Sequence, residues 1–438
     1  MFNNLAVSLA AFVVVIGVMV LIHEWGHYIV AKSLGVTVKV FSIGFGKRLF
    51  GFERNGTDYR VSALPFGGYV KMAGDNPLEG GTEDPGEFNN HSRWHRFLIA
   101  IAGPAMNILF AFLVLTCIYK FHYARPVGEG KAVKVGFVDP GSPAEKAGLQ
   151  PGDEIVSVGE TQNPDWMAVQ TQIAFSPGQP ITLSVLRDSA PKQITFAPKI
   201  QQPDQIGAAG FERALPMLLT EVESGSPAAK AGLREGDTVT TIDGHKVYSE
   251  EGFRRWVQVA AGKPVHVEAV RSGQTLPFDV SPIAANDAGK PRWVVGVRSN
   301  PVEIVQLPLG EAISTSVHEN GQNALMIVEL MKKMVQRKVS IKAMSGPVGI
   351  AQMSGEVIRM PGWSPLLMFM CLISINLGVI NLFPIPIMDG GVILLLAIEA
   401  LMRRDISLNL KERIYQASFV FLVLFAAIVI FNDIAKMH

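Results

Sequence analysis

Residues 21–30 read LIHEWGHYIV, and they continue an apolar run, residues 5–21, that contains no charged side chain. A stretch of this length and composition is typical of a helix that crosses a membrane. His23, Glu24 and His27 stand at its end. An ionisable group at membrane depth costs on the order of 3 kcal/mol on insertion scales, so three such groups close together indicate a site that uses them.

Composition sets the class of protein. The chain has 438 residues, of which 48% are hydrophobic and 18% are charged, and this balance indicates soluble parts joined to membrane spans. The formal net charge of +1 comes without a cluster of Lys and Arg, so we expect no nucleic-acid partner. Cys117 and Cys371 both lie in apolar runs and give no disulfide framework.

Apolar runs recur along the chain and predict a polytopic α-helical membrane protein with four spans. The first run lacks the basic region and the cleavage site of a signal peptide, so we expect it to be retained. We interpret the third span as interrupted near its end, where prolines follow Asn381. The predicted spans are residues 1–34, which carry HEWGH, and residues 97–120, 363–391 and 414–434.

Loop charges predict the orientation of these spans. Lys and Arg residues are frequent in residues 35–96 and in the loop between the third and fourth spans. Because positive loops stay in the cytoplasm, we expect HEWGH near the cytoplasmic side and the long stretch after residue 120 on the other side. In a bacterium, this arrangement predicts a multi-pass inner-membrane protein with a large periplasmic part.

An internal repeat occupies that long stretch. GSPAEKAGLQPGD at 141–153 returns as GSPAAKAGLREGD at 225–237, an offset of 84 residues. Each copy continues into alternating apolar residues, so we predict two domains, 126–208 and 209–300. They are similar to PDZ domains, which hold extended peptides at a sheet edge and would take ligands with free C-termini. The alternative is an ordinary β domain with the same turn sequences.

Two further segments are expected beside the membrane. Residues 35–96 are rich in Val, Phe and Gly with turn signals, which predicts a membrane-associated β region on the cytoplasmic side. Residues 301–362 are predicted to be a periplasmic amphipathic helical region, with helical spacing clearest at 311–338. This helix would either pack on the repeats or lie at the membrane surface.

HEWGH carries the chemistry. Residues four apart share a helix face, so His23 and His27 can direct two imidazole nitrogens at one metal ion. Glu24 is adjacent and can take a proton from water that zinc has made acidic, which is the HExxH arrangement of metal hydrolases. The alternative is a helix end whose polar side chains are solvated at the headgroup level.

A catalytic zinc usually takes three protein ligands. Asp389 is the candidate for the third, because it is an isolated carboxylate within an apolar segment and needs a partner. Pro384 and Pro386 precede it and prevent a regular helix, so we expect opened backbone beside the site. Asn381 would face the same space, where it would either hold a substrate carbonyl or bridge two helices.

These motifs together resemble the site-2 protease family of intramembrane zinc metalloproteases. The matching features are HExxH in the first span, Asn381-xx-Pro384-x-Pro386-xx-Asp389-Gly in the third, and the two PDZ-like repeats between them. The resemblance implies that His23, His27 and Asp389 bind zinc and that Glu24 is the catalytic base.

The resemblance also implies substrates and partners. The substrates would be single-span membrane proteins cut within the bilayer: a pre-trimmed anti-sigma factor, as part of an envelope stress response, and remnant signal peptides. The PDZ-like pair would act as a size filter that admits trimmed substrates. Strands at about 38–72 would meet the unwound substrate edge to edge.

Two rival functions remain. One is a catalytically silent membrane scaffold that binds peptide C-termini with its PDZ-like pair, although such a protein has no need of buried ionisable groups. The other is a zinc peptidase that takes a glutamate as third ligand from a helix after the motif, but no spanning segment offers such a glutamate.

Overall fold

The computed structural model describes residues 2–75, 84–127, 132–287, 290–299, 302–360 and 362–436. The α-helices are α1 (Phe2–Ser33), α2 (Arg93–Phe121), α3 (Pro143–Lys146), α4 (Trp166–Ala174), α5 (Pro227–Ala231), α6 (Glu250–Ala260), α7 (Leu309–Val335), α8 (Pro347–Val357), α9 (Ser364–Asn381), α10 (Asp389–Met402) and α11 (Leu408–Lys436). Short 3-10 turns are η2 (Phe88–Asn90) and η3 (Ile341–Ala343).

The strands begin with the long β1 (Val38–Arg54) and β2 (Thr57–Met72). The others are β3 (Tyr123–Pro126), β4 (Val133–Val138), β5 (Glu154–Val158), β6 (Thr161–Gln162), β7 (Ile181–Arg187), β8 (Ala190–Phe196), β9 (Lys199–Gln201), β10 (Ile206–Ala208), β11 (Phe211–Arg213), β12 (Met217–Val222), β13 (Thr238–Ile242), β14 (His245–Lys246), β15 (Val265–Arg271), β16 (Gln274–Val280), β17 (Ile283–Asp287), β18 (Lys290–Val294), β19 (Val297–Ser299) and β20 (Val302–Val305).

The chain divides into two compact units. The first holds the long apolar helices together with β1 and β2, and the second holds the repeats. Unit 1 consists of Met1–His122, Gln306–Met331 and Met344–His438, and unit 2 of Tyr123–Val305 and Lys332–Ala343.

Four helices among the described residues are long and apolar enough to cross a membrane, which agrees with the predicted number of apolar helices. Their ends differ from those predicted by a few residues in most cases. The apolar portions are Ala6–Ser33 of α1, Arg93–Phe121 of α2, Ser364–Asn381 of α9 and Asn409–Lys436 of α11.

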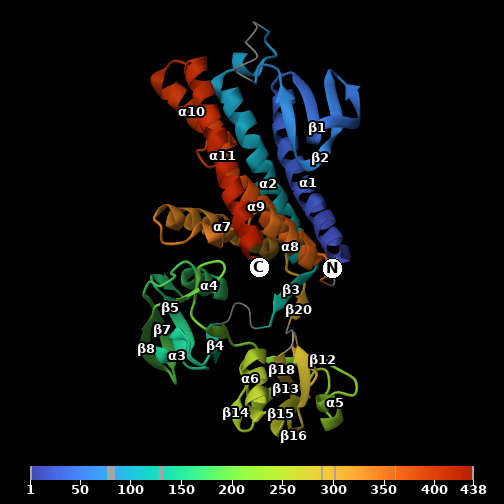
Figure 1. The fold of residues 1–438 in the computed structure, drawn as a ribbon, viewed down its shortest axis with the longest axis vertical. Helices are drawn as coiled ribbons and strands as arrows, with labels where there is room; N and C mark the ends of the chain where they lie inside the picture. Colours follow the sequence, from blue (N-terminus) through green and yellow to red (C-terminus); the bar gives the residue numbers. More distant parts are fainter. Residues whose placement is uncertain are drawn as a thin grey trace. The chain divides into compact units, whose positions relative to one another are not determined.

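α2 forms the centre of unit 1, where it contacts α1, α9 and α10 (Figure 1). Small residues allow its close approach to α1, because a Cβ at Gly26 would lie 2.7 Å from the Met106 side chain. On the α9 side, a Cβ at Gly378 would lie 3.1 Å from the Pro104 carbonyl oxygen. The backbones of three helices are therefore brought close around the HEWGH segment.

The predicted third span, 363–391, differs most from the structure. α9 ends at Asn381, and a separate helix, α10, begins at Asp389. Pro384 and Pro386 lie between them, and proline has no N–H to continue the helical hydrogen bonds. Asp389 therefore stands at the start of a new helix rather than inside the span.

β1 and β2 form an irregular antiparallel sheet beside α1 (Figure 1). Phe41 in β1 is opposite both Val70 and Tyr59 of β2, so this part of β1 is flanked on two sides. Residues 67–72 of β2 consequently form an outer edge. Within the described part of the chain, β1 and β2 pair only with each other.

Unit 2 contains the predicted repeat as two sheets with the same strand order. The first sheet runs β11-β4-β5-β7-β8, and the second runs β19-β12-β13-β15-β16. In both, a two-residue strand also pairs with the central strand, β6 with β5 and β14 with β13. Each sheet has its own hydrophobic core. The sequence repeat is thus a structural repeat, while its assignment as a PDZ pair stays a prediction.

An ion pair between a partly exposed arginine and a buried aspartate recurs at the same offset of 84 residues. Asp153 accepts hydrogen bonds from Arg187 at 2.6 and 2.7 Å, and Asp237 accepts them from Arg271 at 2.7 and 2.7 Å. Arg271 also donates to the Gly232 carbonyl at 2.8 Å, where a helix ends. Each pair therefore connects the last residue of a strand to the end of the repeated motif, 141–153 or 225–237, of its own repeat.

Asp237→Asn is expected to destabilise the second repeat at neutral pH, because Arg271 loses its charged partner. Burial raises the pKa of Asp237, but its hydrogen bonds to Arg271 and to the Arg234 backbone outweigh this and hold that pKa below its usual value. The stabilisation is therefore present above about pH 4 and is lost as pH falls through the lowered pKa. Hydrogen exchange at pH 7 should rise about tenfold or more in β13 and β15.

The control is the first repeat, where exchange in β5 and β7 should not change. The stability difference between variant and parent should also shrink as the solution is acidified below about pH 4. Equal exchange in β13 and β15 of both proteins at pH 7 would show that the Asp237–Arg271 pair does not hold the repeat.

α7 covers most of the predicted amphipathic segment. It leaves large apolar side chains exposed at helical spacing, among them Val317, Leu325 and Val328. Its contact with a membrane surface stays a prediction.

Candidate metal centre and active site

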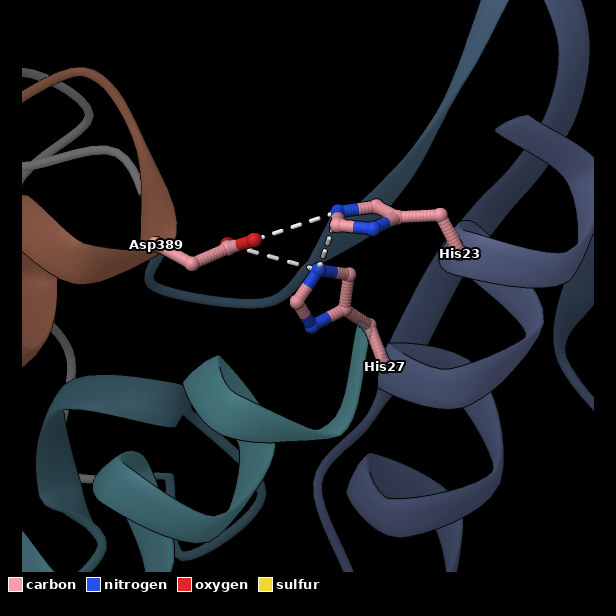
Figure 2. Close-up of side chains that lie close together, drawn as sticks. All are labelled: His23, His27 and Asp389. Carbon is pink, nitrogen blue, oxygen red and sulfur yellow. Dashed lines mark hydrogen bonds and ion pairs between the residues drawn. The ribbon is translucent and has the colours of Figure 1, made fainter. Parts of the chain in front are cut away.

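His23 and His27 lie on successive turns of α1 and direct their imidazole rings to one point. Both residues are buried, and their Nε2 atoms are 3.2 Å apart. Figure 2 shows both rings projecting from α1 toward the Asp389 carboxylate. The four-residue spacing has therefore brought the two side chains together, as expected from the sequence.

Asp389 completes the cluster from the first turn of α10. Its Oδ2 atom lies 3.1 Å from His23 Nε2, and its Oδ1 atom lies 3.3 Å from His27 Nε2. The two glycines that follow Asp389 are needed here, because a Cβ at Gly390 would overlap the Leu382 carbonyl and a Cβ at Gly391 the Ile385 carbonyl. The Asp-Gly-Gly sequence thus lets α10 begin directly against the proline-containing segment.

The tautomer of His27 leaves the lone pair of Nε2 available to bind a cation. His27 Nδ1 lies 2.7 Å from the Ile99 carbonyl oxygen, which can only accept a hydrogen bond. In the neutral ring the proton is therefore on Nδ1, and the lone pair of Nε2 points at His23 and Asp389. An imidazole lone pair and a carboxylate facing each other need a cation between them.

The distances fit zinc. Bonds of 2.0–2.1 Å in a tetrahedral site separate neighbouring ligand atoms by about 3.3 Å. The two Nε2 atoms are 3.2 Å apart, and they lie 3.1 and 3.3 Å from Oδ2 and Oδ1 of Asp389, respectively. With one ligand atom from each residue, all three atoms lie within 4.8 Å of one another. Two nitrogens and one carboxylate oxygen are also a common donor set of catalytic zinc, with the fourth position left for water or substrate. His23, His27 and Asp389 therefore fit the implied ion.

Glu24 is placed beside the cluster and outside it. Its carboxylate accepts a hydrogen bond from the backbone N–H of Val70 in β2. A Cβ at Gly68 would lie 3.5 Å from Glu24 Cγ, so the β2 edge is in close contact with this side chain. The structure thus connects the expected catalytic base to a strand edge.

These residues line one cavity of about 500 Å³. His23, Glu24, His27 and Asp389 lie on its wall together with residues 67–70 of β2. Asn381 lines the same cavity from the last turn of α9. Its position allows contact with a substrate in the cavity, and its catalytic role stays a prediction.

Two residues of α2 belong to the site although no role was predicted for them. A Cβ at Gly103 would overlap Nε2 of His27 and would lie 2.8 Å from Cε1 of His23, so only glycine fits. Asn107 is fully buried, and its side-chain amide lies 3.2 Å from His23 Nδ1. A polar residue in the apolar sequence AGPAMN was the available signal for Asn107.

Asn107 is expected to orient His23. When His23 Nε2 binds a metal, Nδ1 carries the proton and needs an acceptor. Asn107 Nδ2 is the atom that lies 3.2 Å from His23 Nδ1, and Oδ1 is buried without a partner among the described residues. A flip of the amide exchanges the two atoms, so that Oδ1 becomes the acceptor for the His23 N–H. The Asn107 backbone carbonyl accepts a hydrogen bond of 2.9 Å from Ser374, which fixes the residue between α2 and α9.

Asn107→Leu should lower zinc affinity about 10- to 100-fold, because His23 loses the group that fixes its tautomer and ring orientation. Competition with a chromogenic chelator measures this directly. Asn107→Asp keeps an acceptor at the same position and should retain more affinity than Asn107→Leu. Equal affinity of Asn107→Leu and the parent protein would show that Asn107 only packs between the helices.

Known proteins resemble this chain over nearly its whole length. The model of peptidase family M50 matches residues 11–425. The regulator of sigma-E protease RseP of Salmonella typhimurium is 33% identical and aligns over 98% of this chain and 99% of its own. A putative zinc metalloprotease of Vibrio cholerae is 32% identical over 98% of each chain.

Among solved structures, the PDZ domain of an SdrC-like protein from Listeria monocytogenes is 25% identical, with a TM-score of 0.17. It covers 18% of this chain, and 82% of the domain is matched. The family match and the full-length relatives agree with the HExxH site and with the four long apolar helices, which make this a membrane protein. The chain belongs to peptidase family M50, and it is a zinc metalloprotease of the site-2 protease type.

Proposed function

We propose that this protein hydrolyses a peptide bond within the transmembrane segment of single-span membrane proteins. The observation that carries the proposal is the cluster of His23, His27 and Asp389 in one cavity with Glu24, among helices with the composition of membrane spans. Regulated intramembrane proteolysis is the general activity that family membership supports.

The reaction assigns a task to each residue. His23, His27 and Asp389 would hold zinc, which would supply the Lewis acidity that polarises a scissile carbonyl and makes water acidic. Glu24 accepts the proton that water loses on attack and delivers it to the amide nitrogen as the C–N bond breaks, leaving a carboxylate and an amine. Asn381, on the cavity wall, would donate a hydrogen bond to the carbonyl oxygen as its negative charge develops.

The strand edge supports an extended substrate. A helical substrate ties its carbonyls into intrahelical hydrogen bonds and cannot present a peptide bond for attack until it unwinds. Residues 67–70 of β2 line the catalytic cavity, and an outer strand edge can pair with an unwound segment. We therefore propose that the substrate adds as a strand to this edge beside Glu24.

Substrates whose spans contain helix-breaking residues should be cut faster. Each Ala→Gly change near the cleaved bond lowers helix stability by about 1 kcal/mol and should raise the rate of cleavage about fivefold, if unwinding precedes hydrolysis. The measurement is the initial rate for matched single-span substrates in reconstituted vesicles. Equal rates for Ala-rich and Gly-containing spans would count against the strand-addition step.

Substrate identity and orientation belong to the same proposal. The natural substrates would be an anti-sigma factor already trimmed by another protease and remnant signal peptides, with the active site toward the cytoplasm of a bacterial inner membrane. The two repeats of unit 2 would be periplasmic PDZ-like modules that admit trimmed substrates. If the trimmed and intact forms of a substrate were cleaved at the same rate, the two repeats would not select substrates by size.

A further inference from the structure

A second set of charged side chains lines the catalytic cavity. It consists of Arg96 of α2, Glu399 of α10 and Lys411 of α11. Glu399 is fully buried, and its Oε1 atom lies 2.6 Å from Lys411 Nζ and accepts a hydrogen bond of 3.1 Å from the Ile406 backbone N–H. Lys411 and the Ile406 backbone thus already satisfy one oxygen of this carboxylate.

Arg96 is not satisfied in the same way. Its side chain is only 8% exposed, and its nearest anionic atom is Glu399 Oε2 at 3.8 Å from Nη2, which is beyond hydrogen-bonding distance. Within the described ranges, Arg96 Nε has no hydrogen-bond partner. Glu399 Oε2 also has no hydrogen-bond partner within those ranges, so Arg96 and Glu399 face each other as an ion pair without a hydrogen bond. Arg96 Nε is thus an unused donor of a buried guanidinium in the cavity wall.

The second set holds two cations and one carboxylate, so its net charge of +1 would attract an anion into the cavity. Arginine stays charged in proteins, and burying its charge without hydrogen bonds is costly. Its planar donors match a carboxylate in a bidentate geometry. Arg96 precedes Ile99 by about one turn of α2, and the Ile99 carbonyl accepts a hydrogen bond from the metal ligand His27. One peptide segment in the cavity can therefore contact both Arg96 and the metal site.

We propose that Arg96 binds a carboxylate of the substrate chain that occupies the cavity. This inference rests on the proposed function and extends it to a specificity-determining contact. The carboxylate has two sources: an acidic side chain near the scissile bond, or the new C-terminus that hydrolysis leaves. Arg96 therefore favours acidic substrates in the first case and retains the N-terminal product in the second.

Arg93 provides a matched control for Arg96. It lies on the same helix and also forms an ion pair, at 2.7 Å with Asp405, but both partners are more exposed than Arg96 and Glu399. Neither Arg93 nor Asp405 is among the residues that line the cavity. If Arg96 only held helices together, Arg93→Gln and Arg96→Gln would have the same effect on peptide selectivity.

The test is a binding measurement in lipid nanodiscs with the Glu24→Gln protein, so that nothing is cleaved. Labelled apolar peptides are compared by fluorescence anisotropy: a free C-terminal acid with its C-terminal amide, and an amide carrying internal Asp with the same amide carrying Asn. Each pair is measured with Arg96 present, with Arg96→Gln and with Arg93→Gln, both zinc-loaded and after chelation. Chelation separates carboxylate binding by zinc from binding by Arg96.

We expect at least one carboxylate peptide to bind about tenfold tighter than its neutral partner, with and without zinc. Arg96→Gln should remove that preference, and Arg93→Gln should preserve it. A preference for the acid over the amide identifies the product C-terminus, and a preference for Asp over Asn identifies a side chain. If Arg96→Gln does not fold, Arg96→Lys replaces it in the test. Lysine keeps the positive charge but lacks the planar pair of N–H donors, so we expect an intermediate preference for the carboxylate peptide.

No carboxylate preference in the protein with Arg96 intact would overturn the proposal, as would a preference that Arg96→Gln leaves unchanged. These outcomes are independent of proteolysis. A parent enzyme that binds the carboxylate but cleaves no membrane substrate would instead contradict the proposed function.

Discussion

Gly103→Ala is expected to abolish proteolysis and to lower zinc affinity at least about a hundredfold. The added methyl group would overlap Nε2 of His27 and press on Cε1 of His23, so α2 and α1 must separate at the metal site. Zinc content after dialysis against a weak chelator and cleavage of a single-span substrate measure the two effects.

Gly17→Ala is the matched control. Gly17 lies in the same apolar helix as both histidines, and a Cβ there meets nothing within 4 Å. This variant should keep zinc and activity, and a gain in helix propensity is its only expected consequence. If Gly103→Ala were as active as Gly17→Ala, the close approach of α2 to the histidines would not be a feature of the working enzyme.

Glu24→Gln should keep zinc while lowering the rate of cleavage by about 10²- to 10⁴-fold, because glutamine cannot accept the proton from water. Glu24 is not one of the three clustered ligands, so the amide should leave the metal in place. Single-turnover assays with the reconstituted enzyme and metal analysis of the same preparation separate the two properties.

Glu53→Gln, at an exposed position of β1, is the control for the loss of a carboxylate and should remain fully active. Loss of zinc from Glu24→Gln would reassign Glu24 to the ligand set. Full activity of Glu24→Gln would exclude it as the base and require another proton acceptor in the cavity.

The ligands of the site could be predicted from sequence because each one breaks a local rule. His23 and His27 interrupt an apolar helix at four-residue spacing, and Asp389 is an isolated carboxylate in another apolar stretch. Only the structure shows that these three side chains lie together, because Asp389 belongs to the separate helix α10. The prolines before it indicated an interruption but not where the next helix begins.

Gly103 gave no comparable signal, because glycines are frequent in membrane helices and only the position of α1 reveals which of them is in contact. Arg96 could not be distinguished from Arg93 by sequence either. Both stand in SRWHRF at the start of α2, and only burial separates the residue in the cavity wall from the one at the surface.

The repeat was readable from its glycine-rich turns, and the same offset also relates Arg187 to Arg271 at the ends of two strand-like runs. Only the structure shows that each arginine bonds to the aspartate that ends the repeated motif of its own repeat. The double pairing of Phe41 in the β1–β2 sheet had no sequence signal, because period-two alternation does not specify which partner lies on either side.

The most direct test of intramembrane proteolysis by this chain is mass spectrometry of the products of a tagged single-span substrate, incubated in vesicles with the zinc-loaded protein. We predict one cut within the apolar segment, absent after chelation, restored by zinc, and absent with Glu24→Gln. A cut that lies only in the soluble flanks of the substrate, or one that persists in the chelated protein, would contradict a zinc protease that works inside the membrane.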